Sequence, residues 1–495
     1  MTKKVSLFLC IVVLALALVG CASAGPADST NNSGEGAVTT DAPGKTVPVE
    51  TNEFVPNGKK YDSEDFTVLC SGYSIRAKVD FEYAEENQTV LDNAIFNRNQ
   101  EIEALYDIKI SYVQDTGSKN EGAEKIRADY TSGEASYDLS YIGTYSVIGL
   151  AGSEMLYDLN SVPGIDTSKS YWDQNANEDL AINGKLFYST GDISIADDLL
   201  QFAISFNKEA MKKQAPDVNL YQLVEEGKWT FDKLFETSKG FYEEIDGDDT
   251  FTLKDKIGLC VWDDTIYAAL NSSGERIAAY NKNEKTFEVG ILSSERALNV
   301  LDFWALAQNN EGVLNRQRFN QMDGTEATNA FVEGRVLFNT PLMCDLDGLR
   351  NMDTDYGILP YPKFDENQTR YYTSTSAFHM SYVCTVNCDD RIDMRGEIIE
   401  ALAYYGQKHL KPAYEEKTLR GAYVRDEESL ISLDIMAKTR IYDIGFMVKP
   451  ANLHEKIIIF YRDKNTAFAS LLAASRSASE ATIKQLIEDF QFALE

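Results

Sequence analysis

The sequence predicts an α/β protein with two lobes, each built around a largely parallel sheet. Three observations lead to this prediction. Short apolar runs of strand length alternate with segments whose apolar residues recur at helical spacing. Of the 495 residues, 435 follow a polar linker that ends at position 60, and such a body exceeds what one hydrophobic core usually supports. Because the chain has no internal repeat, the second lobe has to interleave with the first or follow it.

Residues 1–20 are typical of an export signal. Two lysines, Lys3 and Lys4, precede an apolar run over residues 7–19, which is shorter than the roughly 20 residues of a membrane span. The next residues, LVGC at 18–21, resemble the lipobox of bacterial lipoproteins, in which the cysteine is acylated, for example with palmitate, and becomes the mature N-terminus. We therefore expect a lipoprotein signal peptide; the alternative is a plain secretory signal.

Residues 21–60 are expected to form the lipidated Cys21 and a disordered linker. The segment is rich in Ser, Thr, Gly, Pro, Asn and Asp and has few residues that build a core. Acyl chains on Cys21 would hold the protein on the outer face of the cell membrane, because each buried methylene contributes about 0.8 kcal/mol. The folded body is expected to begin near Tyr61 and to lie outside the cytoplasm.

Charge and cysteine content exclude several classes of partner. The formal net charge of -31 opposes attraction to nucleic acid or to anionic lipid. Five cysteines follow Cys21, an odd number that does not indicate a disulfide framework. The spacing of Cys384 and Cys388 differs from C-x-x-C, so buried small hydrophobes are the expected role rather than a redox or metal pair.

The first half of the body predicts β, α, β units in sequence. Apolar residues at 91, 95, 102 and 105 recur at helical spacing, and Ile108 and Ile110 then alternate as in a strand. The expected elements are a strand at 66–70, a helix at 91–105, a strand at 108–110, a helix through Ile126, a strand at 139–142 and a helix near 148–156.

The second half repeats the pattern and contains two tryptophans expected in the core. Thr230 is placed to cap a helix, with Trp229 packing on Leu234 as a hydrophobic staple. Trp304 lies on the apolar face of another predicted helix. Residues 258–261 predict a strand.

Several segments in this order resemble the extracellular solute-binding proteins of carbohydrate-type ABC importers (family 1-like), which have a type II periplasmic-binding-protein fold. The order matters more than any single segment, and the resemblance covers nearly the whole body. One departure is Phe206, where the family has the tyrosine of a Tyr-Asn-Lys strand. The segments are RNQEIEALYDIKI (98–110), YDLSYIGTYSVIGLAGSEMLYDL (137–159), INGKLFYSTGD (182–192), FAISFNKEAMKK (202–213), GKWTFDKLFETSK (227–239), FVEGRVLF (331–338), DYGILPYPKF (355–364) and QTRYYTST (368–375).

The resemblance implies two discontinuous lobes joined by hinge crossings, with solute held between them. Matching the crossings to this chain places lobe one at 61–197 with 378–428, and lobe two at 198–377 with 429–495. It further implies an ABC permease as partner, a monomer, no cofactor and no enzymatic activity. The expected ligand is a mono- or oligosaccharide. Alternatives are a peptide or polyamine ligand, or an exported polysaccharide hydrolase that uses two carboxylates.

Ligands of open α/β sheets bind beyond the carboxyl ends of the strands, so residues that follow strands are the site candidates. Aromatic rings would pack on the apolar faces of sugar rings, and carboxylates and hydroxyls would pair with sugar hydroxyls. The alternatives are core packing for Trp262, exposed loop positions for Tyr73 and Tyr145, and a solvated carboxylate at Asp198. The candidates that follow strands are Tyr73, Ser74, Thr144, Tyr145, Trp262 and Asp264. Asp197 and Asp198 near the first crossing, and Tyr371 and Tyr372 leading into the second, are candidates as well.

No metal site or catalytic set is predicted. The acidic stretch at 246–255 fails the EF-hand pattern, because Phe251 and Ile257 stand where Gly and Glu are needed. The chain has three histidines, at 379, 409 and 454, and none lies in a recognisable metal or nucleophile motif.

Overall fold

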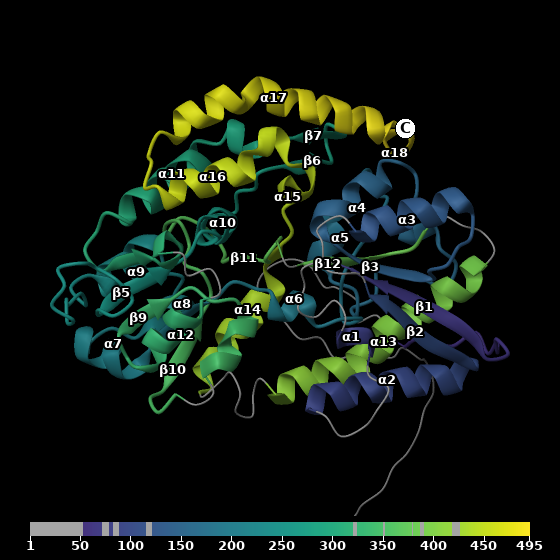
Figure 1. Cartoon of the computed structure of the whole chain (residues 1–495), viewed down its shortest axis with the longest axis horizontal. Helices are drawn as coiled ribbons and strands as arrows, with labels where there is room; N and C mark the ends of the chain where they lie inside the picture. The colour runs from purple at the N-terminus through teal and green to yellow at the C-terminus, as the bar shows by residue number, and fades with distance from the viewer. Residues whose placement is uncertain are drawn as a thin grey trace, which may run out of the picture. The chain divides into compact units, whose positions relative to one another are not determined.

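Two β-sheets with flanking helices organise the protein in a computed structural model (Figure 1). The structure describes residues 53–71, 79–82, 89–114, 121–319, 324–349, 352–378, 380–386, 391–417 and 426–495. The predicted signal peptide, Cys21, most of the linker, Tyr73 and Ser74 lie outside the described residues. Asn52–Glu495 form one compact unit, and residues 53–60 of the linker have no regular structure.

The first sheet has the strand order β12-β3-β1-β2. β1 (Glu64–Cys70) pairs in parallel with β2 (Ile108–Gln114) and β3 (Leu139–Gly143). β12 (Ser381–Cys384), which comes more than 200 residues later, pairs antiparallel with β3, with Ser381 opposite Gly143. The prediction of a β, α, β unit at 91–110 is confirmed, because α2 (Val90–Tyr106) connects β1 to β2.

The second sheet has the order β10-β4-β9-β5-β8. β5 (Ile257–Val261) is parallel to β8 (Val313–Asn315) and to β9 (Val336–Asn339). β4 (Ile204–Asn207) is antiparallel to both β9 and β10 (Tyr356–Leu359). Each sheet therefore contains one antiparallel strand, and the prediction of largely parallel sheets is confirmed.

Three segments run between the two sheets. The helix α6 (Ala196–Leu199) precedes β4, and β11 (Thr373–Ser374) leads from the second sheet back to β12. β13 (Arg440–Ile441) pairs in parallel with β11, so these crossings are hydrogen-bonded to one another. The lobe limits expected at 197, 377 and 428 remain predictions.

Helices cover both sheets. α13 (Ile392–Lys417) lies beside α2 on one face of the first sheet (Figure 1). The other α-helices are α1 (Val79–Glu82), α3 (Glu121–Ser132), α4 (Thr144–Ala151), α5 (Gln174–Leu180), α7 (Lys208–Gln214), α8 (Leu220–Glu225), α9 (Phe231–Ser238), α10 (Thr265–Ser272), α11 (Glu295–Ala307), α12 (Thr325–Val332), α14 (Glu428–Lys438), α15 (Gly445–Val448), α16 (Leu453–Arg462), α17 (Phe468–Asp489) and α18 (Gln491–Leu494). A hairpin of β6 (Ala279–Asn281) and β7 (Thr286–Glu288) and 3₁₀ turns at Leu159–Ser161, Gly290–Leu292, Arg316–Phe319, Met343–Leu349 and Pro450–Asn452 complete the described elements. No described helix is both long and apolar enough to cross a membrane.

The structure confirms two local predictions and corrects a third. Thr230 caps α9, its hydroxyl accepting from the Lys233 N–H, and the tryptophans at 229 and 304 are buried in the core. The helix expected near 148–156 instead begins at Thr144 and ends at Ala151. Gly143 is its N-cap, and a glycine N-cap gives no side-chain signal of a helix start. Thr144 and Tyr145, expected in a loop, therefore lie in the first turn of α4.

Candidate ligand-binding site

Three neighbouring parallel strands of the second sheet, β9, β5 and β8, end at one edge, and the residues that follow them line a common hollow. Trp262 follows β5, Arg316 follows β8, and Thr340 follows β9. These residues surround a hollow of about 250 Å³, here called the Trp262 hollow. Its other lining residues are Gly324, Thr325, Thr328, Asn329, Asn339, Pro341, Asp345 and Gly348. Hydroxyl and amide side chains dominate this wall, and they offer both donors and acceptors.

Neighbouring side chains fix the Trp262 ring. The indole stacks on Phe202 with ring centroids 5.6 Å apart, and the Arg316 guanidinium carbon lies 5.2 Å from the indole centroid. The indole N–H donates to the Thr340 carbonyl at 2.7 Å. Trp262 is 9% exposed, so it is at once part of the core and part of the wall. Core packing and contact with a ligand are therefore compatible for Trp262.

The two aspartates after Trp262 differ in their surroundings. Asp263 forms an ion pair with Arg462, and Asn315 donates to its carboxylate at 3.4 Å. Asp264 is 7% exposed, and its carboxyl makes no hydrogen bond or ion pair with the described residues. Burial, reinforced by the charge of Asp263, raises the pKa of Asp264 to about 8. Asp264 is therefore mostly neutral at pH 7.

We expect Asp264 to make the protein less stable as the pH rises from about 4 to about 8. An unfolded Asp ionises near pH 4, whereas folded Asp264 keeps its proton up to about 8, so the native state binds the extra proton within this window. The slope from one such group is at most about 1.4 kcal/mol per pH unit. Thermal unfolding of Asp264→Asn should show a flatter pH dependence and higher stability at pH 8. A wild-type slope in the variant would contradict the prediction.

Aromatic rings connect the first sheet to this region. Tyr145, in the first turn after β3, lies 5.7 Å from Phe378 and 6.2 Å from His454, measured between ring centroids. Phe378 is in turn 6.5 Å from Tyr267 of α10, the helix that starts directly after Asp264. The neighbouring Thr144 donates its hydroxyl to the Met380 carbonyl and is buried, which is a structural role. The carboxyl end of β3 and that of β5 thus approach the same aromatic cluster.

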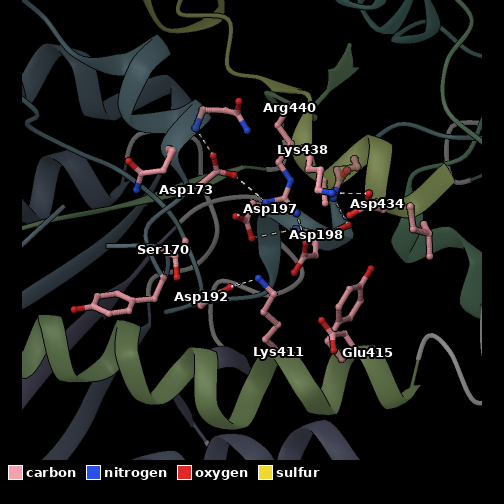
Figure 2. A pocket seen from close by; sticks show the side chains of 18 of the residues that line it. Ser170, Asp173, Asp192, Asp197, Asp198, Lys411, Glu415, Asp434, Lys438 and Arg440 are labelled. Carbon is pink, nitrogen blue, oxygen red and sulfur yellow. Dashed lines mark hydrogen bonds and ion pairs between the residues drawn. The ribbon is translucent and has the colours of Figure 1, made fainter. Parts of the chain in front are cut away.

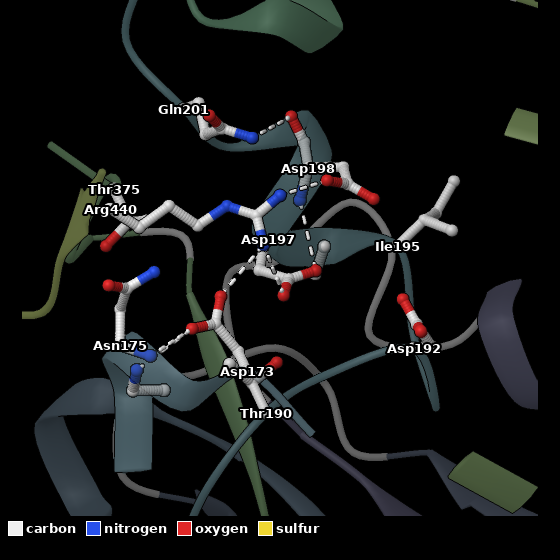
Figure 3. A network of polar contacts seen from close by, with 12 residues as sticks. Asp173, Asn175, Thr190, Asp192, Ile195, Asp197, Asp198, Gln201, Thr375 and Arg440 are labelled. Carbon is white, nitrogen blue, oxygen red and sulfur yellow. Dashed lines mark hydrogen bonds and ion pairs between the residues drawn. The ribbon is translucent and has the colours of Figure 1, made fainter. Parts of the chain in front are cut away.

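Asp197 and Asp198 lie elsewhere, at a cavity of about 620 Å³ (Figure 2). Both pair with Arg440 of β13, which also binds Asp173 at 2.8 Å; the distance to Asp197 is 3.1 Å (Figure 3). Tyr442 donates its hydroxyl to Asp173 at 2.8 Å. We call this space the Arg440 cavity. One arginine therefore joins the segment before α5, the helix α6 and the strand β13.

The ionisation of this network follows from burial and pairing. Burial opposes the charge of Asp173, but Arg440 and donated hydrogen bonds outweigh it, so the pKa of Asp173 is lowered. At Asp197 burial and the neighbouring carboxylates prevail, and its pKa is raised. Burial also opposes the charge of Arg440, but the three aspartates raise its pKa. The arginine therefore stays charged and is held by excess negative charge.

The two predicted tyrosines before β11 do not join the Trp262 hollow. Tyr371 is buried, and its hydroxyl donates to the Val224 carbonyl at 3.1 Å, which favours a structural role. Tyr372 lines a separate hollow of about 400 Å³, with the Arg370 guanidinium carbon 4.5 Å from its ring centroid.

Arg316, Asn329, Asn339 and Thr340 line the Trp262 hollow but were not predicted from the sequence. Two of these four could have been found, because Asn339 ends the apolar run at 336–339 and Thr340 directly follows it. Arg316 follows a strand of only three residues. Asn329 lies inside α12 and carries no such signal.

The acidic stretch brings together three carboxylates, those of Glu244, Asp246 and Asp255. All three already have protein partners. Glu244 accepts the backbone N–H of Gly247 at 2.7 Å. Asp255 accepts backbone N–H groups from Ile245 and Thr252, and Asp246 pairs with Lys254 at 3.2 Å. These contacts account for the local arrangement without a cation.

Comparison with solved structures shows which class of protein has this fold. A cyclic alpha-maltosyl-1,6-maltose binding protein from Arthrobacter globiformis is 14% identical, with a TM-score of 0.57 over 86% of this chain and 100% of that one. A cyclo/maltodextrin-binding protein complexed with maltotetraose is 14% identical, with a TM-score of 0.54 over 87% of this chain and 98% of that one. A family 1 extracellular solute-binding protein from Bifidobacterium longum subsp. infantis is 15% identical, with a TM-score of 0.51 over 88% and 100%.

The chain therefore has the two-lobed α/β fold of extracellular solute-binding proteins, as predicted. No family model matches the sequence. No curated protein matches it either.

Proposed function

We propose that this protein is the substrate-binding component of an ABC importer and that it holds a carbohydrate at the Trp262 hollow. The observation that carries the proposal is the composition of that hollow. A tryptophan stands among threonine hydroxyls, asparagine amides and the Asp345 carboxylate, at the carboxyl ends of three parallel strands. Sugar rings present apolar faces to aromatic rings and hydroxyls to such polar groups. Sheets of this class bind their ligands at this edge.

Two further points support a carrier of sugars rather than an enzyme. The solved proteins with this fold are described as binding proteins, and two of them bind maltose-type oligosaccharides. A hydrolase of this kind would need two carboxylates free to act as acid and base. Asp263, which follows Trp262, instead forms an ion pair with Arg462. Of the predicted site residues, Trp262 lines the hollow. Tyr145 and Asp264 do not line it, and ligand-binding roles for them stay predictions. Those of Tyr73 and Ser74 stay predictions as well.

The test is a binding screen of the full chain against mono- and oligosaccharides, read by thermal unfolding. A ligand present at 100 times its dissociation constant should stabilise the folded state by about 2.7 kcal/mol. We expect at least one sugar to raise the melting temperature saturably and to be recovered intact. Cleavage of the sugar would instead support a hydrolase, and stabilisation by peptides or polyamines alone would remove the carbohydrate.

The proposal includes a lipid anchor at Cys21. Replacing Cys21 by Ser should leave sugar binding unchanged and release the protein from the membrane, because the thioether-linked acyl chains can no longer be attached. Membrane fractionation of cells that express each form checks this. A Cys21→Ser protein that stays with the membrane would show that Cys21 is not the anchor.

A further inference from the structure

The Arg440 cavity is larger than the Trp262 hollow, and the proposed function does not use it. Its volume of about 620 Å³ compares with about 250 Å³ at Trp262. Its walls come from residues 170–175, from the end of α13, from α6 and from α14 (Figure 2). A cavity with polar groups from several elements is the usual form of a small-molecule site.

The walls carry an excess of negative charge. Six carboxylates line the cavity, from Asp173, Asp192, Asp197, Asp198, Glu415 and Asp434, against three cations, Lys411, Lys438 and Arg440. Each cation already has a carboxylate partner: Lys411 lies 3.6 Å from Asp192, Lys438 lies 2.7 Å from Asp434, and Arg440 is shared by three. The carboxylates thus outnumber the cations by three. Water screens charge less effectively in such a partly enclosed space.

The pKa values of two of these carboxylates are raised. Burial raises the pKa of Asp192 to about 6, and Asp198 adds to the rise against the opposing charge of Lys411. Burial likewise raises the pKa of Asp197. A cation in the cavity would relieve both effects, because an opposite charge within a few ångströms favours the ionised carboxylate.

An unused acceptor lies at the same wall. Gln201 lines the cavity, is 4% exposed and donates its amide N–H to the Asp198 carbonyl at 3.4 Å (Figure 3). Its side-chain oxygen has no hydrogen-bond partner among the described residues. A buried acceptor without a donor is costly, so a donor supplied by a ligand would be favourable.

The opposite wall is apolar. Met343, Tyr414, Leu430, Leu433 and Ala437 line it, and they offer surface for a hydrocarbon body. A bare metal ion would make no use of that surface. In the described part of the chain, moreover, the three carboxylates close enough to share a metal ion are those of Glu244, Asp246 and Asp255, which lie outside this cavity.

We propose that the Arg440 cavity is a second ligand site, for a small organic cation that combines an ammonium group with an alkyl body. The ammonium group would donate to Glu415, which pairs with no cation among the described residues, and to Gln201. The alkyl body would pack on the leucines. A neutral sugar lacks the charge that these walls require. The two hollows therefore take ligands of different chemical class.

The test is a titration of the full chain, without sugar, with the diamine putrescine as probe. Isothermal calorimetry measures the binding. We expect saturable binding of one molecule per chain and none of the uncharged diol of the same length. Glu415→Lys should weaken putrescine binding about tenfold or more, since it removes one excess carboxylate and places an ammonium group in the cavity. Glu416→Lys is the matched control, because it makes the same charge change one residue away at a position that does not line the cavity.

Equal losses in the two variants would overturn the site, because they would mean that putrescine responds only to the overall charge of -31. Absence of saturable binding to the wild type would overturn it as well. Both exchanged residues are exposed, and thermal unfolding of each variant verifies that it is folded. Since no sugar is present, neither outcome depends on the proposed function.

Discussion

Replacing Arg440 by Gln should lower the free energy of unfolding by about 3–5 kcal/mol. The arginine side chain is 9% exposed, and its partners Asp173 and Asp197 are each 4% exposed. Without the guanidinium these carboxylates remain buried and face one another uncompensated. Removal of one partner from a buried ion pair is costly for this reason, even though the intact pair adds little net stability. Urea unfolding at pH 7 measures the loss.

The control is Arg276→Gln. Among the described residues Arg276 pairs with one carboxylate, that of Asp179, at 2.7 Å. Its side chain is 27% exposed, so water can take over part of the lost interaction and the expected loss is smaller. A second variant that combines Arg440→Gln with Asp197→Asn should recover stability, since it removes one of the stranded charges. Equal losses for the two arginines would show that the Arg440 network has no special energetic weight.

The pH dependence of this stability loss tests its cause independently. Arg440 helps to lower the pKa of Asp173 below its unfolded value, so this contribution is present above about pH 4 and is lost as the pH falls through the folded pKa. The difference between the wild type and Arg440→Gln should therefore shrink below about pH 4. A difference that stays constant into acid would indicate lost packing rather than lost charge pairing.

Local periodicity predicted much of the architecture. The unit at 91–110 was identified because apolar residues repeat at the helical period and then alternate, and each signal lies within a few residues. The α4 boundary was missed because its cap is a glycine, which has no polar side chain to reveal the start. The pairing of β12 with β3 depends on contacts between distant segments, and the resemblance to a known family rather than periodicity placed the return crossing near 378.

The site was harder to predict because its residues were chosen one strand at a time. Trp262 and Tyr145 were proposed because each follows an obvious apolar run. Arg316 follows a strand of three residues, too short to stand out by its pattern. Asp198 was assigned to the ligand because it lies near the first expected crossing between the lobes. Its partner Arg440 stands 242 positions later, and no local pattern reveals such a pair.

Replacing Trp262 by Ala should weaken sugar binding by about 2 kcal/mol or more, about thirtyfold, and should also cost about 3–5 kcal/mol of stability. The affinity loss is expected because the indole is the aromatic wall of the hollow. The stability loss is expected because the same ring stacks on Phe202 and donates to Thr340, with only 9% of its surface exposed. Urea unfolding of the ligand-free protein and titration with a sugar that passes the screen measure the two effects.

The control for this experiment is Trp304→Ala. Trp304 is 1% exposed and packs edge to face on Phe231 and Phe235, and it does not line the hollow. We expect it to lose a similar amount of stability and to keep its affinity in the molecules that remain folded. Trp262→Phe keeps an aromatic ring against Phe202 but cannot donate to Thr340, so it should fall between the wild type and Trp262→Ala in both measurements. If Trp262→Ala and Trp304→Ala bind the sugar equally well, Trp262 belongs to the core alone and the ligand lies elsewhere.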